Sequence, residues 1–428
     1  MIVSLPALFK VLLIFSVIVI FNRFKLDLGL SILVGTLLLG LWFGQGLSET
    51  LVMILQGVTE PLTLMLVLLV SLILGMNCLL ELSGGQKRMV NALSGMMKRT
   101  RLSLTAFPAL IGLLPMPGGA YFSAPMVDQM SRDLPLSPEK KSIINYWFRH
   151  IWEFWWPMYP GVITAVTLTG FSVTNFILLQ CVYTPVAFLL GYLVLLRGLS
   201  IPTGIASEKS ATPVKNFLSA SLPVWLVLGC VIVLGTLSPL WEGRIVPAGL
   251  FSQYIPMFLG LFLALLWIIK DFRGRMKEAA SAFFNQKTLQ LIFLILAVMA
   301  YKNVLNLSGA IQLISGELKT FHIPIMMVVM LLPFLSGMVI GVAVGFVGAS
   351  FPLVLSLTAG LPHQAAYITL AYGFGYFGMM LSPIHVCLVL TNNYFKGNLS
   401  KNYRYLLPLG LGMICFILLW HTVIRTFF

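Results

Sequence analysis

The sequence is poor in charge. Only 9% of its 428 residues are charged while 59% are hydrophobic, and soluble proteins carry roughly 25% charged residues. A soluble core of this size could not bury so much apolar surface, so we expect the chain to lie in lipid. The short alternating apolar and polar segments of an outer-membrane barrel are also missing. The composition therefore predicts an all-α polytopic membrane protein.

Three motifs of enzymes and ATP-driven pumps are absent as well. The chain has no G-x-x-x-x-G-K-S/T loop, no H-E-x-x-H helix and no G-x-S-x-G elbow. The protein is therefore not expected to be an enzyme. The five cysteines, Cys78, Cys181, Cys230, Cys387 and Cys415, lie in apolar runs without the spacing of metal ligands, so packing is their predicted role. We expect no metal site and no cofactor.

The net charge of +14 does not indicate a nucleic-acid-binding protein. The 27 basic residues cluster in the loops between apolar runs. No basic stretch is interleaved with aromatic residues as a nucleic-acid groove requires. The expected partners are the lipid bilayer and a small solute, with no nucleic acid.

The apolar runs are long enough for about ten transmembrane helices. The first run lacks the basic start and the small-residue cleavage site of a signal peptide, so we interpret it as a retained helix. The predicted spans lie near 4–21, 28–44, 62–82, 142–168, 172–197, 218–239, 247–269, 289–306, 364–395 and 404–427.

Two further apolar stretches, 103–131 and 323–359, are predicted to be re-entrant hairpins. Each is too long for one span, and a Gly/Pro cluster near its middle leaves halves too short to cross alone. With two hairpins, most basic residues collect on the cytoplasmic side and both termini lie outside. A single crossing at either stretch would flip everything after it and lose that asymmetry.

The order of these features suggests an internal repeat. Segment 82–85 reads Leu-Ser-Gly-Gly, and 307–310 reads Leu-Ser-Gly-Ala, 225 positions later. Gly119 at the first hairpin tip matches Gly348, and the proline break at Pro157 matches Pro383. Five spans and one hairpin form an odd-membered unit, so the second copy is expected to be inverted in the membrane. The predicted units are repeat 1 (1–199), a cytoplasmic linker (200–217) and repeat 2 (218–428).

The hairpin tips are the first candidate part of a binding site. The first tip, 115–123, reads Pro-Met-Pro-Gly-Gly-Ala-Tyr-Phe-Ser, and the second, 345–352, reads Gly-Phe-Val-Gly-Ala-Ser-Phe-Pro. A half-helix that starts at such a tip presents free N–H groups and a positive dipole end, which receive anions. The candidate substrate-binding residues here are Pro117, Gly118, Gly119, Ser123, Gly348, Ala349 and Ser350.

Two predicted spans are themselves interrupted. Span 142–168 breaks at 155–161, which contains Pro157, and span 364–395 breaks at 381–385. Carbonyls freed at a break can hold Na⁺, while opposing helix starts can hold a carboxylate. The candidate substrate-binding residues at the breaks are Pro157, Ser382, Pro383 and His385. The alternative is that these prolines only kink packed helices.

Ionisable residues at membrane depth are functional candidates. Asp128 lies about two turns beyond the first tip, and His150 and Glu153 share a helix face before the first break. These three are the candidates for holding Na⁺ or moving a coupling proton. The alternative is that Arg149, His150 and Glu153 form a structural ion-pair network.

Four of these segments carry a family resemblance. Segments 114–120, 149–157, 348–352 and 381–385 resemble the ion transporter superfamily, which includes divalent anion/sodium symporters, gluconate permeases and arsenite permeases. Within it they are most similar to an uncharacterised prokaryotic integral membrane family with no assigned function.

The resemblance implies a homodimer in the prokaryotic cytoplasmic (inner) membrane. It also implies scaffold helices in 4–61 and 218–269, and a transport part of hairpins and broken helices that moves as an elevator. The chain lacks the paired Ser-Asn-Thr tip motifs of the dicarboxylate symporters, so Na⁺ and H⁺ coupling both stay open. We therefore expect secondary-active transport of a small anionic solute, of the organic carboxylate class. A passive channel or an intramembrane enzyme is the alternative.

Overall fold

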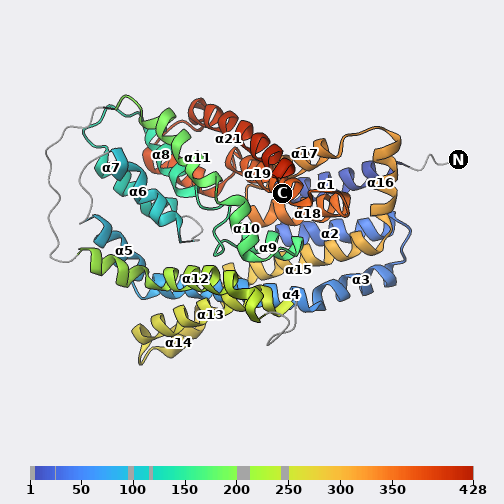
Figure 1. Ribbon diagram of the computed structural model, residues 1–428, viewed down its shortest axis with the longest axis horizontal. Helices are drawn as coiled ribbons and strands as arrows, with labels where there is room; N and C mark the ends of the chain where they lie inside the picture. Colours follow the sequence, from blue (N-terminus) through green and yellow to red (C-terminus); the bar gives the residue numbers. More distant parts are fainter. Residues whose placement is uncertain are drawn as a thin grey trace.

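The computed structural model describes residues 5–24, 26–94, 101–114, 119–199, 213–241 and 250–427. Within these ranges the regular secondary structure is helical, without a strand (Figure 1). Six helical stretches are long and apolar enough to cross a membrane: Pro61–Leu82, Val173–Leu196, Phe217–Ser238, Tyr254–Phe272, Met276–Leu307 and Leu399–Phe427. The prediction of an all-helical membrane protein is confirmed, while several other predicted spans are shorter apolar helices.

The helices before residue 200 are α1 (Ala7–Arg23), α2 (Leu28–Trp42), α3 (Leu47–Thr59), α4 (Pro61–Leu82), α5 (Gly85–Ser94), α6 (Arg101–Gly112), α7 (Ala120–Met130), α8 (Pro138–His150), α9 (Pro160–Thr169), α10 (Val173–Gln180), α11 (Tyr183–Gly191) and the π-helical turn η1 (Tyr192–Leu196). The later ones are α12 (Pro213–Trp241), α13 (Leu250–Ile269), the 3-10 turn η2 (Lys270–Phe272), α14 (Met276–Ser281), α15 (Gln286–Leu307), α16 (Ala310–Thr320), α17 (Ile325–Ile340), α18 (Ala343–Thr358), α19 (Gln364–Met380), α20 (Val386–Phe395) and α21 (Leu399–Phe427).

Helices α4 and α15 show how the two halves correspond. Both contain 22 residues, and their first residues are 225 positions apart. Each is followed by a serine cap and then by a glycine with positive φ, Gly84 at 70° and Gly309 at 76°. Glycine adopts this left-handed conformation without steric penalty, so it ends a helix readily. The repeated Leu-Ser-Gly segments therefore mark the same helix end in each half.

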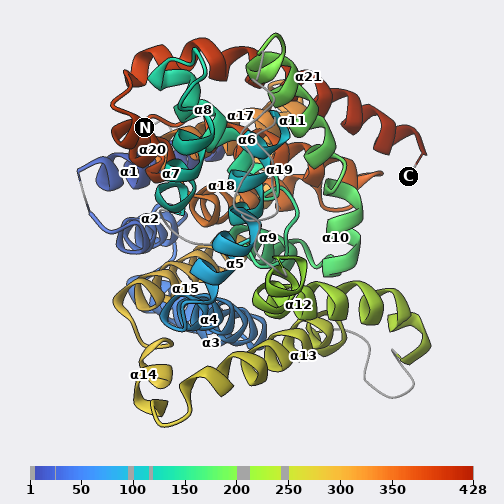
Figure 2. The ribbon, with the colours of Figure 1, turned by 90° about the vertical axis from the view of Figure 1, so that its left-hand side faces the viewer.

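The packing of the two halves is reciprocal. Helix α5 packs on α12 as α16 packs on α1, and α4 packs on α13 as α15 packs on α2. Helix α7 packs on α20 as α18 packs on α9. In Figure 2, α3, α4 and α12 to α14 lie together below the bundle of α6 to α11 and α17 to α21. Each half thus completes its packing with helices of the other.

Both predicted hairpin segments contain two helices that pack on each other. Segment 103–131 contains α6 and α7, and segment 323–359 contains α17 and α18. The chain turns between α17 and α18 at Gly341, whose φ is 70°, and α18 begins two residues later. A helix pair with a turn this short folds back on itself.

The predicted position of the second tip was wrong. Residues 345–352 lie inside α18, so Gly348, Ala349 and Ser350 are helical and not at a turn. A Cβ on Gly348 would lie 2.2 Å from Val298 Cγ2 of α15, so this glycine serves helix packing. The Ser350 hydroxyl donates to the Phe346 carbonyl of its own helix. The match of Gly119 with Gly348 therefore fails, and Ala120 corresponds instead to Ala343, the first residue of α18.

The two interrupted spans are each divided into separate helices. Helix α8 ends at His150 and α9 begins at Pro160, while α19 ends at Met380 and α20 begins at Val386. A proline lies in each interruption, where its missing N–H and its ring oppose helix continuation. The start of α9 is largely buried, whereas α20 begins at the exposed Val386, between the buried His385 and Cys387.

The structure has four helices in segments that were predicted only as connections between spans. These are α3, α5, α14 and α16. Helix α3 packs on α15 with one face only, so its apolar residues do not form the continuous run that marks a span. The predicted linker begins outside the described residues, and α12 already starts at Pro213, before its predicted end.

Two glycines allow the hairpins to approach the interrupted spans closely. A Cβ on Gly112 of α6 would lie 2.0 Å from the carbonyl oxygen of Arg149 in α8. A Cβ on Gly337 of α17 would lie 2.1 Å from the carbonyl oxygen of Gly375 in α19. The two contacts are equivalent in the two halves, because each partner lies 225 or 226 positions after its counterpart. In the first half this contact sets the position of Arg149.

Candidate functional site

The end of α8 and the start of α20 bring two histidines together. His150 is the last residue of α8, and His385 is the N-cap of α20. Their Nε2 atoms are 3.2 Å apart, and both side chains are buried. Tyr146, one turn before His150, packs its ring against both imidazoles. The contact joins residues that are 235 positions apart in the chain.

Backbone carbonyls set the protonation of the two imidazoles. His150 Nδ1 lies 2.6 Å from the Tyr146 carbonyl oxygen, and His385 Nδ1 lies 2.8 Å from the Gly341 carbonyl oxygen. A carbonyl oxygen can only accept, so each Nδ1 donates, and each Nε2 of a neutral imidazole then carries a lone pair. Two lone pairs that face each other at this distance require a proton or a cation between them.

Arg149 and Glu153 place a buried ion pair beside the histidines. Arg149 Nη1 lies 3.6 Å from Glu153 Oε1, and the two side chains are only 1% and 8% exposed. The same carboxylate oxygen lies 3.7 Å from His150 Nε2. Arg149 Nη1 also donates to the Sγ of buried Cys387 at 3.7 Å. The guanidinium thus connects the first interrupted span with α20.

Two helix starts flank the guanidinium. Gly119 is the N-cap of α7, and a Cβ at this position would lie 2.4 Å from Arg149 Nη2. Only a glycine therefore lets the guanidinium approach the start of α7. On the other side, Cys387 belongs to the first turn of α20. Unpaired N–H groups at helix starts favour negative charge, so both helices add to the positive character of Arg149.

The starts of α9 and α18, which are the counterparts of α20 and α7 in the other half, also meet. A Cβ on Gly161, in the first turn of α9, would lie 2.4 Å from the Cβ of Ala343, the first residue of α18. The starts of α7 and α20 are connected through the Arg149 guanidinium, whereas those of α9 and α18 contact each other directly. Each pair combines one helix from each half of the chain.

Tyrosine hydroxyls from both halves hold the interrupted segments. Tyr376 donates to the His150 carbonyl at 2.5 Å and Tyr159 donates to the Gly112 carbonyl at 2.5 Å. Tyr372 donates to the Glu153 carbonyl at 3.1 Å. Carbonyls at the end of a helix have no intrahelical partner, so these hydroxyls satisfy groups that lipid could not.

A family model described as "Protein of unknown function (DUF401)" matches residues 7–424. The chain belongs to this family. No curated protein matches it. The DUF401 match extends over both halves and therefore includes both interrupted spans and every residue of the histidine, cysteine and arginine cluster.

Three predicted site residues of this DUF401 chain meet in the cluster, namely His150, Glu153 and His385. Ser382 is buried in the second interruption, and among the described residues its hydroxyl has no hydrogen-bond partner. Asp128 is separate from the cluster: it lies near the far end of α7 and pairs with Lys141 at 2.9 Å, with half of its side chain exposed.

The remaining predicted residues are more dispersed. Ser123 is buried in α7 and donates to the Ala120 carbonyl of its own helix. Pro157 and Pro383 lie in the two interruptions, while Pro117 and Gly118 lie outside the described residues. The structure contains the predicted ion pair between Arg149 and Glu153 and places His150 Nε2 beside the same carboxylate oxygen.

Sequence reasoning missed two members of the DUF401 cluster. Arg149 was considered only as part of a structural network, and Cys387 was assigned to packing. The available signal for Cys387 was its place two residues after His385, at a predicted helix start. Spacing along the chain could not reveal that His150 approaches both, because α8 lies in the other half.

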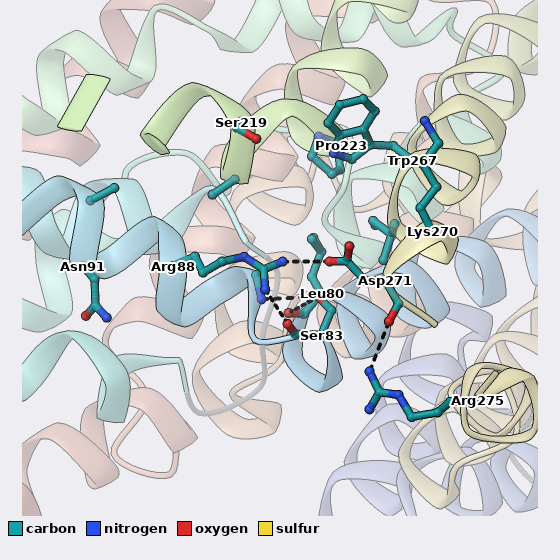
Figure 3. A pocket seen from close by; sticks show the side chains of 14 residues that line it. Leu80, Ser83, Arg88, Asn91, Ser219, Pro223, Trp267, Lys270, Asp271 and Arg275 are labelled. Carbon is teal, nitrogen blue, oxygen red and sulfur yellow. Dashed lines mark hydrogen bonds and ion pairs between the residues drawn. The ribbon is translucent and has the colours of Figure 1, made fainter. Parts of the chain in front are cut away.

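The space beside the cluster is small. A cavity of about 10 Å³ adjoins His150, lined by residues such as Phe154 and Tyr376, and this is about the room of one water molecule. A larger cavity of about 990 Å³ lies elsewhere, between α4, α5, α12 and α13 (Figure 3). Its wall contains the Arg88–Asp271 ion pair at 2.8 Å and none of the predicted site residues. The cavity beside His150 therefore has room for about one water molecule and not for a solute.

Proposed function

We propose that the protein is a secondary-active transporter that moves a small anionic solute of the organic carboxylate class, coupled to Na⁺ or H⁺. The observation that carries the proposal is the meeting of helix starts from both halves, with the Arg149 guanidinium between the starts of α7 and α20. Helix starts inside a packed apolar protein are the arrangement by which transporters hold anions at the membrane midplane.

The charge of the site favours an anion. A guanidinium stays charged at all relevant pH values and presents several N–H donors in a planar fork, which suits a carboxylate. Arg149 is almost fully buried, and Glu153 is its neighbouring carboxylate. A solute carboxylate that bound here would gain hydrogen bonds from the guanidinium and from the first turns of α7 and α20.

The proposed architecture is two inverted repeats with about ten spans and two re-entrant hairpins. The equal spacing of helices and the reciprocal packing of the halves support it. The scaffold would contain α1 to α3 with α12 and α13, and the hairpins and interrupted spans would move as an elevator. A homodimer in the prokaryotic cytoplasmic membrane completes the proposal.

The coupling ion would bind beside the solute. Carbonyls freed at the two interruptions and the Glu153 carboxylate are oxygen ligands of the kind that Na⁺ requires. Asp128 lies outside the cluster with half of its side chain exposed, whereas Glu153 is buried beside the histidines, so Glu153 is the carboxylate that we assign to coupling. If H⁺ is the coupling ion, an imposed H⁺ gradient takes the place of the Na⁺ gradient in the transport experiment.

Transport is tested with purified protein in liposomes. A thermal-shift screen of acetate, lactate, succinate and gluconate, with and without Na⁺, selects the solute, because a ligand that binds the folded state raises its melting temperature. We expect the selected solute to accumulate against its gradient when a Na⁺ or H⁺ gradient is imposed.

The alternatives give different results in the same experiment. Downhill flux without accumulation under any imposed gradient would indicate a passive channel and overturn the proposal. Turnover of a peptide or lipid by the purified protein would indicate an intramembrane enzyme.

A further inference from the structure

Three potential metal-binding atoms lie together at the junction of the two halves. One ligand atom from each of His150, His385 and Cys387 lies within 4.8 Å of the other two, and all three side chains are buried. His385 and Cys387 come from the start of α20, and His150 comes from the end of α8. Imidazole and thiolate are the ligands that zinc-like ions prefer.

The Nε2 atoms of the two imidazoles have the separation of two ligands on one metal ion. Two nitrogens bound 2.0–2.1 Å from a tetrahedral ion lie roughly 3.3 Å apart, and the observed Nε2–Nε2 distance is 3.2 Å. Each Nδ1 lies within hydrogen-bond distance of a backbone carbonyl, that of Tyr146 or that of Gly341. Metal-binding histidines use this second contact to orient the ring and direct the other nitrogen to the ion.

We infer that His150 Nε2, His385 Nε2 and Cys387 Sγ bind one divalent transition-metal ion of the Zn²⁺ class. Glu153 is the candidate for a fourth ligand, since its Oε1 lies 3.7 Å from His150 Nε2. Of the three ligand atoms, the Cys387 sulfur would have to move most, toward the two nitrogens. A sulfur bound at about 2.3 Å from the ion would lie roughly 3.5 Å from each nitrogen.

The surrounding charges suit a divalent ion with a thiolate ligand. Binding releases the Cys387 proton, and the thiolate together with the Glu153 carboxylate offsets the two charges of the ion. Arg149 Nη1 donates to the sulfur at 3.7 Å and would stabilise the thiolate.

A bound ion would connect elements of both halves. It would join α8 to α20, and through the His385 contact with the Gly341 carbonyl it would also hold the turn between α17 and α18. The ion would therefore stabilise the observed arrangement of the interrupted spans. This inference goes beyond the proposed transport function and does not require it, because binding is measured without flux.

The test is metal binding to the full-length protein in detergent or nanodiscs. After removal of metal with a chelator, Co²⁺ is titrated as a spectroscopic probe, and Zn²⁺ is then added as a competitor. We expect one Co²⁺ per chain, with the absorption of a tetrahedral ion and a sulfur-to-cobalt charge-transfer band. Cys387→Ser should abolish that band, and Cys387→Ser and His385→Ala should each weaken binding at least about tenfold.

Matched controls exist in the same chain. Cys181→Ser removes a half-buried thiol outside the cluster. His421→Ala removes a buried histidine whose Nδ1 also contacts a carbonyl, that of Ala366, but whose Nε2 has no partner among the described residues. Both controls should bind Co²⁺ as the unmodified protein does. If the unmodified protein binds no stoichiometric Co²⁺, or binds it without the thiolate band, the inference is overturned. This result does not depend on whether the variants fold.

Discussion

The two interrupted spans share a backbone plan but differ in chemistry. The first is bordered by Arg149 and contains Glu153, and it extends over 151–159 between α8 and α9. The second, 381–385, reads Leu-Ser-Pro-Ile-His and contains neither an acidic residue nor an arginine or lysine. At the positions equivalent to Arg149 and Glu153, 226 residues later, the chain has Gly375 and Met379.

This difference shows that the helix arrangement is repeated in the two halves, whereas the residues of the candidate site are not. The first half supplies the charged groups, and the second supplies His385 and Cys387, so neither half contains the cluster alone. Equivalent packing contacts should therefore respond equally to substitution, whereas equivalent site positions should not.

The largest effect is expected from Arg149→Met. It leaves Glu153 buried without its cation, which should cost about 3–5 kcal/mol of stability. It also removes two charge-assisted hydrogen bonds to the solute, a loss of about 3 kcal/mol or roughly 100-fold in affinity. Thermal unfolding and binding of the carboxylate selected in the screen measure the two effects.

The double variant Arg149→Met with Glu153→Gln separates these contributions. Removing both charges should restore most of the stability but none of the solute affinity. Full solute binding in the double variant would show that the pair is structural, which was the alternative interpretation of this network.

The next largest effect tests the equivalence of the two halves. Gly112→Ala and Gly337→Ala each place a Cβ about 2 Å from a backbone carbonyl oxygen, of Arg149 and of Gly375. Backbone cannot yield as a side chain does, so each substitution should destabilise by about 1–3 kcal/mol. Gly316→Ala is the control, since its Cβ would meet nothing within 4 Å among the described atoms. A clear difference between the two test variants would contradict the structural equivalence.

A smaller effect is expected from the tyrosines that hold helix ends. Tyr376→Phe leaves the His150 carbonyl without its hydroxyl donor, and Tyr159→Phe does the same to the Gly112 carbonyl. Each should lose about 1 kcal/mol, measured as a lower melting temperature. Tyr376→Phe should also alter Co²⁺ affinity, because it acts next to a proposed ligand.

The smallest effect concerns a contact between the halves outside the membrane spans. Glu139 accepts a hydrogen bond from the Asn398 backbone N–H at 3.1 Å, and this bond lowers the pKa of the Glu139 carboxyl. Because the folded pKa lies below the unfolded one, the stabilisation is present above about pH 4.3 and is lost as pH falls through the lowered pKa. The group is exposed, so we expect at most about 0.5 kcal/mol.

This contact is measured as the difference in melting temperature between the unmodified protein and Glu139→Gln. The difference should be small at pH 7 and should vanish in acid. An equal difference at both pH values would show that the carboxylate charge is not involved.

Local signals in the sequence predicted much of the helix arrangement. The apolar runs indicate membrane helices, Gly84 and Gly309 mark two helix ends, and Pro157 and Pro383 mark the two interruptions. The hairpin helices follow from apolar stretches of unusual length. The second turn was misplaced, because a glycine required for packing at Gly348 has the same appearance in sequence as a glycine at a turn.

Hydropathy and the backbone preferences of glycine and proline act over a few residues, so the sequence by itself determined the helical class, some of the helix ends and the two interruptions. The cluster was decided by tertiary structure alone. His150 and His385 are 235 positions apart, and their contact depends on the packing of α8 against α20. Cys387 looks like any cysteine in an apolar run until that packing places it beside Arg149 and two imidazoles.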